Sequence, residues 1–242
     1  MRLSIATLIG LPLAAAVALP ANAATRSFPV PSFTKLRVEG PYTVRVRSGG
    51  RASVVANGPA ARIDKLIVES RGDMLVVTTE KGWNWRSVSW GKNDAVMIDI
   101  GVATLESAEL TGSGDISIDK VRTTAFSALL TGSGNMVVGQ LETSRLKAAV
   151  TGSGDLSIAG RTGRADTMVQ GSGDLRAAGL TVNLLTASVA GSGDITVGPT
   201  RIARASIVGS GDITVGGRPS CTFNKVGSGD IRCGGKLMDK KD

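Results

Sequence analysis

The most regular feature of the chain is an alternation of apolar and polar residues around a repeated tetrapeptide. Gly-Ser-Gly-Asp begins at Gly112, Gly152, Gly171, Gly191, Gly209 and Gly227, and Gly132 begins the variant Gly-Ser-Gly-Asn. These positions recur at a nearly constant interval along the chain, with a period of about 20 residues. A period of this length predicts a solenoid, in which each repeat forms one coil that stacks on the next.

The residues on both sides of the tetrapeptide alternate with a period of two, which indicates strands with one buried face. The first and third residues after each Asp or Asn are mostly aliphatic, and the residue between them is mostly polar. The second residue before the first glycine is also aliphatic in all copies except the last, where it is Lys225. Each coil is therefore predicted to contain a strand, the tetrapeptide corner, a second strand and a return segment. Glycines mark a second corner at Gly139, Gly160, Gly179, Gly198, Gly216 and Gly234.

The composition of the tetrapeptide suits a stacked turn. Glycine reaches positive φ at low cost, and coils about 4.8 Å apart leave little room for a side chain. Asp and Asn can accept hydrogen bonds from nearby backbone amides. We therefore interpret one residue of each coil as part of a turn-capping ladder: Asp115, Asn135, Asp155, Asp174, Asp194, Asp212 and Asp230. Stacked carboxylates could instead bind calcium, but the known calcium-binding repeat has a different period. No metal or other cofactor is predicted.

These patterns predict an all-β fold, a parallel β-helix or related β-solenoid with coils of about 20 residues. The regular part runs from residue 105 to 235. Residues 24–104 lack the tetrapeptide, but they contain short strands separated by Gly, Pro and Asn turns. We expect them to form irregular first coils that are continuous with the solenoid in one domain. Residues 236–242 are expected to form a charged tail.

The N-terminal segment 1–23 has the features of a secretory signal peptide. Arg2 supplies the positive charge, an apolar stretch follows, and Ala21-Asn22-Ala23 matches the small residues of a cleavage site. The alternative is a retained membrane anchor, which the two prolines and the short apolar run disfavour. No second stretch approaches the ~20 apolar residues that span a bilayer. The mature chain is therefore expected to lack a transmembrane segment and to lie in the periplasm or at the cell surface.

The net charge of the chain favours some classes of binding partner over others. The chain has 28 Lys and Arg against 20 Asp and Glu, so removal of Arg2 with the signal leaves a net charge of +7. An exported protein does not meet chromosomal DNA, so nucleic acid is not an expected partner. An anionic envelope glycan or an envelope protein is a better candidate, although the charge could also serve solubility alone. The oligomeric state does not follow from the sequence.

All three tryptophans lie close together in the sequence, and they form the strongest candidate binding patch. Trp83, Trp85 and Trp90 alternate with Arg86 and Lys92 in a segment between two predicted strands. This arrangement is typical of a hairpin tip. Exposed Trp and Arg are frequent anchors of interfaces, and aromatic rings stack on sugars. The alternative is local packing of the rings against the side or end of the solenoid.

The two cysteines are predicted to form a disulfide. Cys221 and Cys233 fall at inward positions on the two opposing strands of the last repeat. An exported protein permits such a bond, which would clamp the terminal coil. The alternatives are two buried thiols or a redox pair, but the spacing is not that of a Cys-x-x-Cys motif.

The repeat and the residues before it resemble a known family. Val38-Glu39-Gly40 and Tyr42-Thr43-Val44, the repeated Gly-Ser-Gly-Asp/Asn and the late segment Gly216 to Pro219 are similar to the putative auto-transporter adhesin head GIN domain family. The resemblance covers essentially the whole mature chain. It implies an exported β-solenoid of bacterial envelopes.

Catalytic chemistry finds little support in the sequence. The chain contains no histidine, which excludes a Ser-His-Asp triad and His-ligated metals. Most carboxylates of the regular part belong to repeat turns, and no catalytic residues are predicted. We expect a non-enzymatic, adhesin-like or structural interaction module of the cell envelope. The alternatives are a polysaccharide-processing enzyme on a β-helix scaffold and a periplasmic protein-binding assembly or stress factor.

Overall fold

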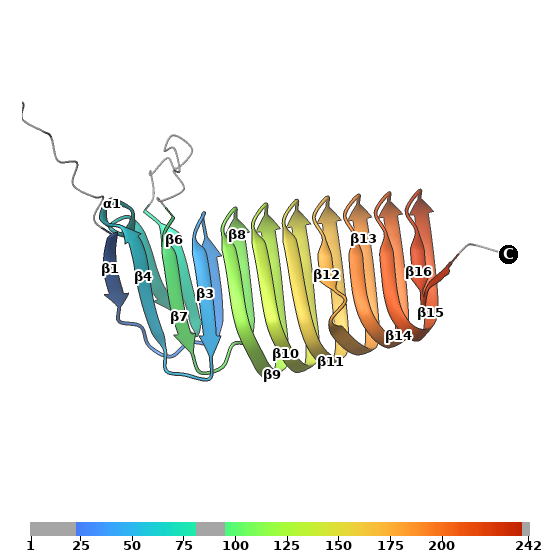
Figure 1. The fold of residues 1–242 in the computed structure, drawn as a ribbon, viewed down its shortest axis with the longest axis horizontal. Helices are drawn as coiled ribbons and strands as arrows, with labels where there is room; N and C mark the ends of the chain where they lie inside the picture. Colours follow the sequence, from blue (N-terminus) through green and yellow to red (C-terminus); the bar gives the residue numbers. More distant parts are fainter. Residues whose placement is uncertain (1–22, 81–94, 239–242) are drawn as a thin grey trace, which may run out of the picture.

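A computed structural model of the chain describes residues 23–80 and 95–238. It shows a rod of stacked strands with the described ends of the chain at opposite ends of the rod (Figure 1). The predicted all-β solenoid is confirmed. In this part of the chain, one four-residue helix, α1 (Ala60–Ile63), is present beside the strands.

The regular coils consist of long bent strands that run from one tetrapeptide to the next. The elements are β8 (Ser107–Gly112), β9 (Asp115–Gly132), β10 (Asn135–Gly152), β11 (Asp155–Gly171), β12 (Leu175–Ala177), β13 (Leu180–Gly191), β14 (Ile195–Gly209), β15 (Ile213–Gly227) and β16 (Ile231–Cys233). Neighbouring coils pair in parallel and in register, so that Asn135 lies between Asp115 and Asp155. The return segment expected after the second corner is therefore itself a strand.

The two glycines of each corner have different roles. The first glycine adopts a φ between 119° and 134° in all seven copies, a region that other residues rarely reach. The second glycine has an ordinary φ, but its hydrogen points at the preceding coil. A Cβ at Gly134 would lie 2.0 Å from the carbonyl oxygen of Gly114. Two reasons for glycine were predicted, positive φ and close packing between coils. The first applies to the first glycine of the tetrapeptide, and the second applies to the second glycine.

Aliphatic side chains fill the narrow space between the two faces of each coil. They stack as ladders of equivalent residues, because parallel in-register pairing places like side chains above one another. One ladder from each face illustrates the pattern. The residue after the Asp or Asn is buried in every coil: Ile116, Met136, Leu156, Leu175, Ile195, Ile213 and Ile231. The facing ladder before the first glycine is buried in all but the last coil: Leu110, Leu130, Val150, Val169, Val189 and Ile207.

The coil that precedes the regular repeat is formed by β2 (Lys35–Glu39) and β3 (Thr43–Ser48). β2 pairs in parallel with β8, and β3 pairs in parallel with β9. Thr43 lies beside Asp115, so Gly40-Pro41-Tyr42-Thr43 occupies the position of the tetrapeptide. The pairing therefore reveals an additional corner, distant in sequence from the one at Gly112, that the repeat pattern does not show.

The outermost coil comes later in the chain. β6 (Met74–Thr79) pairs in parallel with β2, and β7 (Met97–Val102) pairs in parallel with β3. The spatial order of the coils at this end is therefore β6–β7, then β2–β3, then β8–β9. The order of these coils in the stack therefore differs from their order in the chain. The chain leaves the stack after β3 and returns to cover its end before the regular repeat begins.

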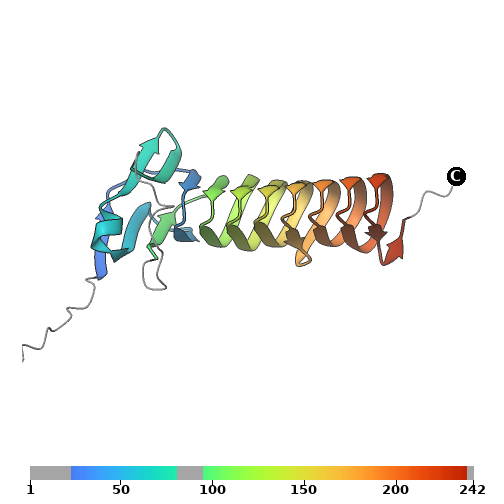
Figure 2. The ribbon, with the colours of Figure 1, turned by 90° about the horizontal axis from the view of Figure 1, so that it is seen from above.

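Antiparallel strands complete the N-terminal end of the rod. β4 (Ser53–Pro59) pairs with β7, and β1 (Ala23–Phe28) pairs with β4. On the other face, β5 (Leu66–Arg71) pairs with β6. Figure 2 shows that these strands spread beyond the width of the regular coils. The expected cleavage site falls at the start of β1, and residues 1–22 lie outside the described part.

The C-terminal end is closed less completely. Lys236–Leu237 forms β17, which pairs antiparallel with β16 and extends one face by a short strand. The backbone amide of Met238 also donates to the carbonyl of Ile231 at 2.8 Å. The first residues of the segment expected as a charged tail therefore continue the sheet. On the other face, Phe223 and Lys225 point inward but remain half-exposed, because no described strand covers them.

Candidate functional site

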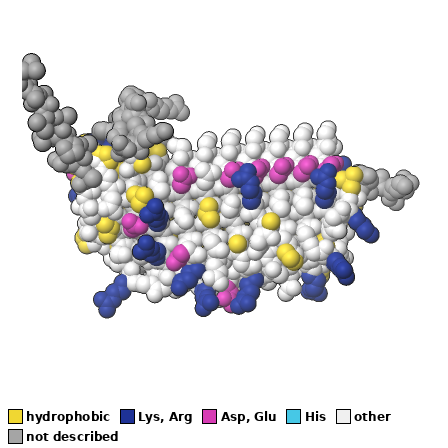
Figure 3. Space-filling view, in the orientation of Figure 1, with side chains coloured by type: hydrophobic (Ala, Val, Ile, Leu, Met, Phe, Trp, Pro, Cys, Tyr) yellow, Lys and Arg dark blue, Asp and Glu magenta, His cyan; other side chains and the backbone are white. Residues whose placement is uncertain are grey.

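The ladder residues lie in a row along the edge formed by the tetrapeptide corners (Figure 3). Each carboxylate except that of Asp230, in the last coil, accepts a hydrogen bond from the coil that follows. The amide of Asn135 donates to Asp115 Oδ1, and the amides of Asp174, Asp194, Asp212 and Asp230 each donate to the preceding Asp, all at 2.8–3.2 Å. The sequence suggested a bond within the same turn, whereas these bonds connect one coil with the next. Each of these five accepting Asp side chains thus links two corners.

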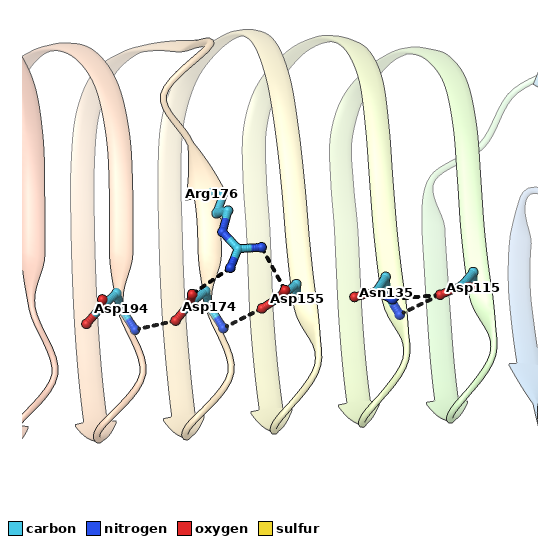
Figure 4. Close-up of polar contacts among 6 residues, drawn as sticks. All are labelled: Asp115, Asn135, Asp155, Asp174, Arg176 and Asp194. Carbon is cyan, nitrogen blue, oxygen red and sulfur yellow. Dashed lines mark hydrogen bonds and ion pairs between the residues drawn. The ribbon is translucent and has the colours of Figure 1, made fainter.

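Arginine side chains neutralise part of this row. Arg176 donates through Nη1 to Asp155 at 2.7 Å and through Nη2 to Asp174 at 2.8 Å (Figure 4). The hydrogen bond to Asp155 raises the pKa of Arg176. Arg232 contacts Asp212 and Asp230 in the same way at 3.5 and 2.9 Å. Because one fork spans two carboxylates, each arginine holds two adjacent coils together.

Asn135 and Asp194 of the row contact no arginine of the described residues. Asn135 donates through Nδ2 to Asp115 at 2.8 Å, so an amide takes the place of a cation there. Asp194 has no ion pair with any described residue, although its oxygen accepts the amide of Asp212. Across the described ranges 23–80 and 95–238, no group of three or more His, Cys, Asp or Glu side chains is arranged to hold a metal ion.

Cys221 and Cys233 form a disulfide, which confirms the predicted pairing. Their Cα atoms are 6.6 Å apart, and the two cysteines have a sequence separation of 12. The bond connects β15 with β16 across the last coil. It thus lies at the end where β17 is the one antiparallel strand among the described residues.

The tryptophan patch cannot be placed. Trp83, Trp85, Trp90, Arg86 and Lys92 lie outside the described residues. The strands on either side of this segment, β6 and β7, are described, and Met97 of β7 is in register with Thr43 of β3.

A groove at the second corner was not predicted from the sequence. It has a volume of about 510 Å³ and crosses four coils. Its lining is polar: Thr123, Thr124, Glu142, Thr143, Ser144, Arg161, Thr162, Gly163, Thr181 and Asn183. The signal was available, because Thr123, Thr143 and Thr162 recur with the period of the repeat. These residues form no known motif, so the period alone did not mark them as a site.

An ion-pair chain runs across this groove. Arg122 and Arg161 lie on either side of Glu142 in adjacent coils, and both pair with its carboxylate, Arg122 at 3.3 Å. The hydrogen bond from Arg161 lowers the pKa of Glu142, so this carboxylate is ionised at neutral pH. The hydroxyls of Thr143 and Thr162 donate to the carbonyls of Arg145 and Arg164 at 3.1 and 3.0 Å. Both hydroxyl oxygens keep the capacity to accept a further hydrogen bond.

The fold and its polar edges define a class, the β-solenoids with stacked glycine corners. The family model described as "putative auto-transporter adhesin, head GIN domain" matches residues 32–219, and the chain belongs to this family. The predicted resemblance is confirmed. No curated protein matches the chain.

Solved structures of similar fold come from bacterial proteins. A putative adhesin from Bacteroides fragilis is 25% identical, with a TM-score of 0.80, over 87% of this chain and 96% of that one. A structure from Parabacteroides distasonis, described as a putative lipid binding protein, is 22% identical with a TM-score of 0.69, over 88% and 97% of the two chains. A putative adhesin from Parabacteroides merdae is 17% identical with a TM-score of 0.67, over 88% and 96%. Because their sequence identity is so low, the two Parabacteroides structures show the shared fold alone.

Proposed function

We propose that the chain is a non-enzymatic, adhesin-like interaction module of the bacterial cell envelope. The observation that carries this proposal is the family match over residues 32–219, supported by the 25% identical adhesin structure of the same fold. The family is consistent with an exported or surface protein. No helix among residues 23–80 and 95–238 is long and apolar enough to span a membrane.

The mechanism is presentation by a rigid rod. In-register pairing, carboxylate links between corners and the terminal disulfide each restrain neighbouring coils relative to one another. A rod of this kind offers long, repetitive surfaces that suit an extended ligand. The partner is an envelope glycan or an envelope protein.

The enzymatic alternative would use a second groove of larger volume, about 730 Å³, whose lining includes Glu106, Glu109 and Asp166. These carboxylates are already engaged. Glu109 pairs with Arg37 at 2.7 Å, Asp166 pairs with Arg164 at 3.1 Å, and Glu106 accepts the hydroxyl of Thr34 at 3.4 Å. A glycosidase needs one protonated and one ionised carboxyl group across the scissile bond. Glu109 and Asp166 each bind an arginine instead, so neither carboxylate is free to flank a scissile bond, which argues against that role.

The test is binding of the purified mature chain to envelope fractions and to whole bacterial cells. We expect saturable binding without release of reducing sugar ends from envelope polysaccharide. Trp83→Ala/Trp85→Ala/Trp90→Ala, run beside the wild type, locates the contact: a loss of binding with an unchanged melting temperature assigns it to the tryptophan segment. Release of reducing ends would support the enzyme instead, and absence of binding to either preparation would overturn the proposal.

A further inference from the structure

The charges of the regular coils are separated across the width of the rod. The tetrapeptide edge, residues 112–118 and their equivalents through 227–233, carries six Asp and two Arg. The second-corner edge comprises residues 119–127, 139–147, 159–166, 178–186, 198–204 and 216–222. It carries nine Lys or Arg and three Asp or Glu. The two edges therefore have net charges of −4 and +6, and Figure 3 shows the cations gathered along the edge opposite the acidic row.

The distance between the two edges is large enough that a charged partner bound at one edge interacts little with the charges of the other. The strand from the second corner to the tetrapeptide has about six residues, so the edges are roughly 20 Å apart. The Debye length is about 8 Å at physiological ionic strength. The acidic row is thus screened from a ligand at the second-corner edge, and such a ligand meets a positive surface about 24 Å long.

Several of the cations are available to a ligand. Arg145, Arg201 and Arg204 are exposed and have no ion pair with any residue of the described ranges. By contrast, Arg122 and Arg161 share Glu142, and Arg164 pairs with Asp166. The edge therefore contains both guanidinium groups without an ion pair and guanidinium groups held by a carboxylate. The first kind can bind a carboxylate or sulfate in a bidentate manner.

The groove at the second corner lies within this positive edge. Its hydroxyl and amide groups, from Thr123, Ser144, Thr181 and Asn183 among others, can exchange hydrogen bonds with sugar hydroxyls. The groove has no exposed apolar side chain to insert into a bilayer. The large exposed hydrophobic residues of the described chain, Val137, Met168, Val208, Val226 and Leu237, do not line it. This favours a polysaccharide over a lipid surface, since interfacial binding depends on buried apolar area.

We propose that the second-corner edge binds a linear anionic polysaccharide along the rod. Its acidic groups contact Arg145, Arg201 and Arg204, and its hydroxyls occupy the groove beside Glu142 and Arg161. This inference rests on the proposed interaction function and assigns it a site and a ligand class. The tryptophan segment is not needed for it.

The test measures binding of the mature chain to polygalacturonate, with neutral dextran and anionic phosphatidylglycerol vesicles as comparison probes. We expect binding to polygalacturonate that weakens as salt rises, because exposed charges are screened. Arg145→Glu/Arg201→Glu should weaken it by at least tenfold. Arg26→Glu/Arg71→Glu, which makes the same change of charge in the N-terminal cap, should change it less than threefold.

A second pair of variants tests the groove. Ser144→Leu places an apolar side chain in the groove, and Ser117→Leu makes the same exchange at an exposed position on the tetrapeptide edge. We expect several-fold weaker binding for Ser144→Leu only, with circular dichroism and melting temperature unchanged for both. Equal binding by the edge variant and its control, equal binding to dextran, or binding to the vesicles alone would overturn the assignment.

The outcomes separate this inference from the proposed function. Binding to envelope fractions without binding to polygalacturonate would overturn the site and ligand assigned here and leave the interaction function standing. Binding to polygalacturonate through the edge without binding to envelope fractions would support the site and overturn the envelope role.

Discussion

Two adjacent corners of the rod turn the chain between the same two faces but consist of different residues. Gly112-Ser113-Gly114-Asp115 turns the first regular coil, and Gly40-Pro41-Tyr42-Thr43 turns the coil beside it. A Cβ at Gly114 would lie 2.4 Å from the carbonyl oxygen of Tyr42. At the equivalent position, Tyr42 carries a full aromatic side chain that is only 4% exposed.

The difference arises from the neighbouring segment that each corner faces toward the N-terminal end of the rod. Gly114 faces the tight corner at Tyr42, whereas Tyr42 lies beside the C-terminal end of β6 at Thr79. The Tyr42 hydroxyl bonds Thr79 Oγ1, in the last residue of β6, at 2.6 Å. The second glycine is therefore a requirement of close stacking, while the turn itself tolerates a large side chain.

The largest expected effect is at a second glycine. Gly134→Ala would place a Cβ 2.0 Å from the Gly114 carbonyl, so the two coils must separate. We expect a loss of about 3 kcal/mol or more in the free energy of unfolding, measured by chemical denaturation. Gly50→Ala is the matched control, because no atom lies within 4 Å of its Cβ, and its effect should stay within about 0.5 kcal/mol. Similar losses for both variants would contradict the stacking explanation.

The second effect concerns the two ends of the rod. The N-terminal end is closed by antiparallel strands, and the C-terminal end by the disulfide and β17. Cys221→Ser/Cys233→Ser should lower the free energy of unfolding by about 2–3 kcal/mol, from loop entropy. Reducing agent should lower the melting temperature of the wild type and leave that of the variant unchanged. Hydrogen exchange at the Met238 amide should also accelerate. An unchanged transition under reduction would show that the end is held without the disulfide.

The hydroxyl of Tyr42 is expected to contribute less. Tyr42→Phe removes the hydrogen bond to Thr79 in a part-buried site and should cost about 1 kcal/mol. A double-mutant cycle with Thr79→Val measures the pair directly, and its coupling energy should be of the same size. Additive single effects would mean that Tyr42 stabilises the corner through packing of the ring alone.

The smallest effects distinguish members of the carboxylate row, which the N-terminal coils lack. Asp194→Asn removes a charge without an ion pair, and the new amide can donate to Asp174 as Asn135 does to Asp115. Like charges about 4.8 Å apart repel by roughly 0.9 kcal/mol in water before screening. We expect a gain of about 0.5 kcal/mol or no change. Asp174→Asn should instead cost about 0.5 kcal/mol, because it weakens the contact with Arg176. The opposite ranking in thermal denaturation would refute this account of the row.

The features predicted well from the sequence are those that recur with the repeat. The coil length, the buried ladders, the glycine corners and the pairing of Cys221 with Cys233 all follow from positions relative to the tetrapeptide. Except for the disulfide, which crosses one coil, each depends on residues that contact their equivalents one repeat away. A periodic pattern reports such contacts directly, because every copy repeats the same local constraint.

The N-terminal end and the candidate groove were not predicted, for two physical reasons. The corner at Gly40 pairs with the distant corner at Gly112, because the chain first leaves the stack to build the cap. Pairing across such a long stretch of sequence leaves no period in it. The groove is assembled from residues of four coils, and its polar lining differs little from ordinary solvent-exposed positions. The short strand β17 was likewise hidden in a charged tail.

The sequence by itself therefore determined the coil, its two faces and the clamp at its end, since these depend on alternation and on a corner repeated seven times. Only the tertiary structure decided which strand lies outermost at the N-terminal end, where Tyr42 replaces a glycine, and how charge divides between the two edges. Those properties depend on which coils are neighbours in the stack. They also depend on the corner that each side chain faces. Neither is set until distant segments have paired.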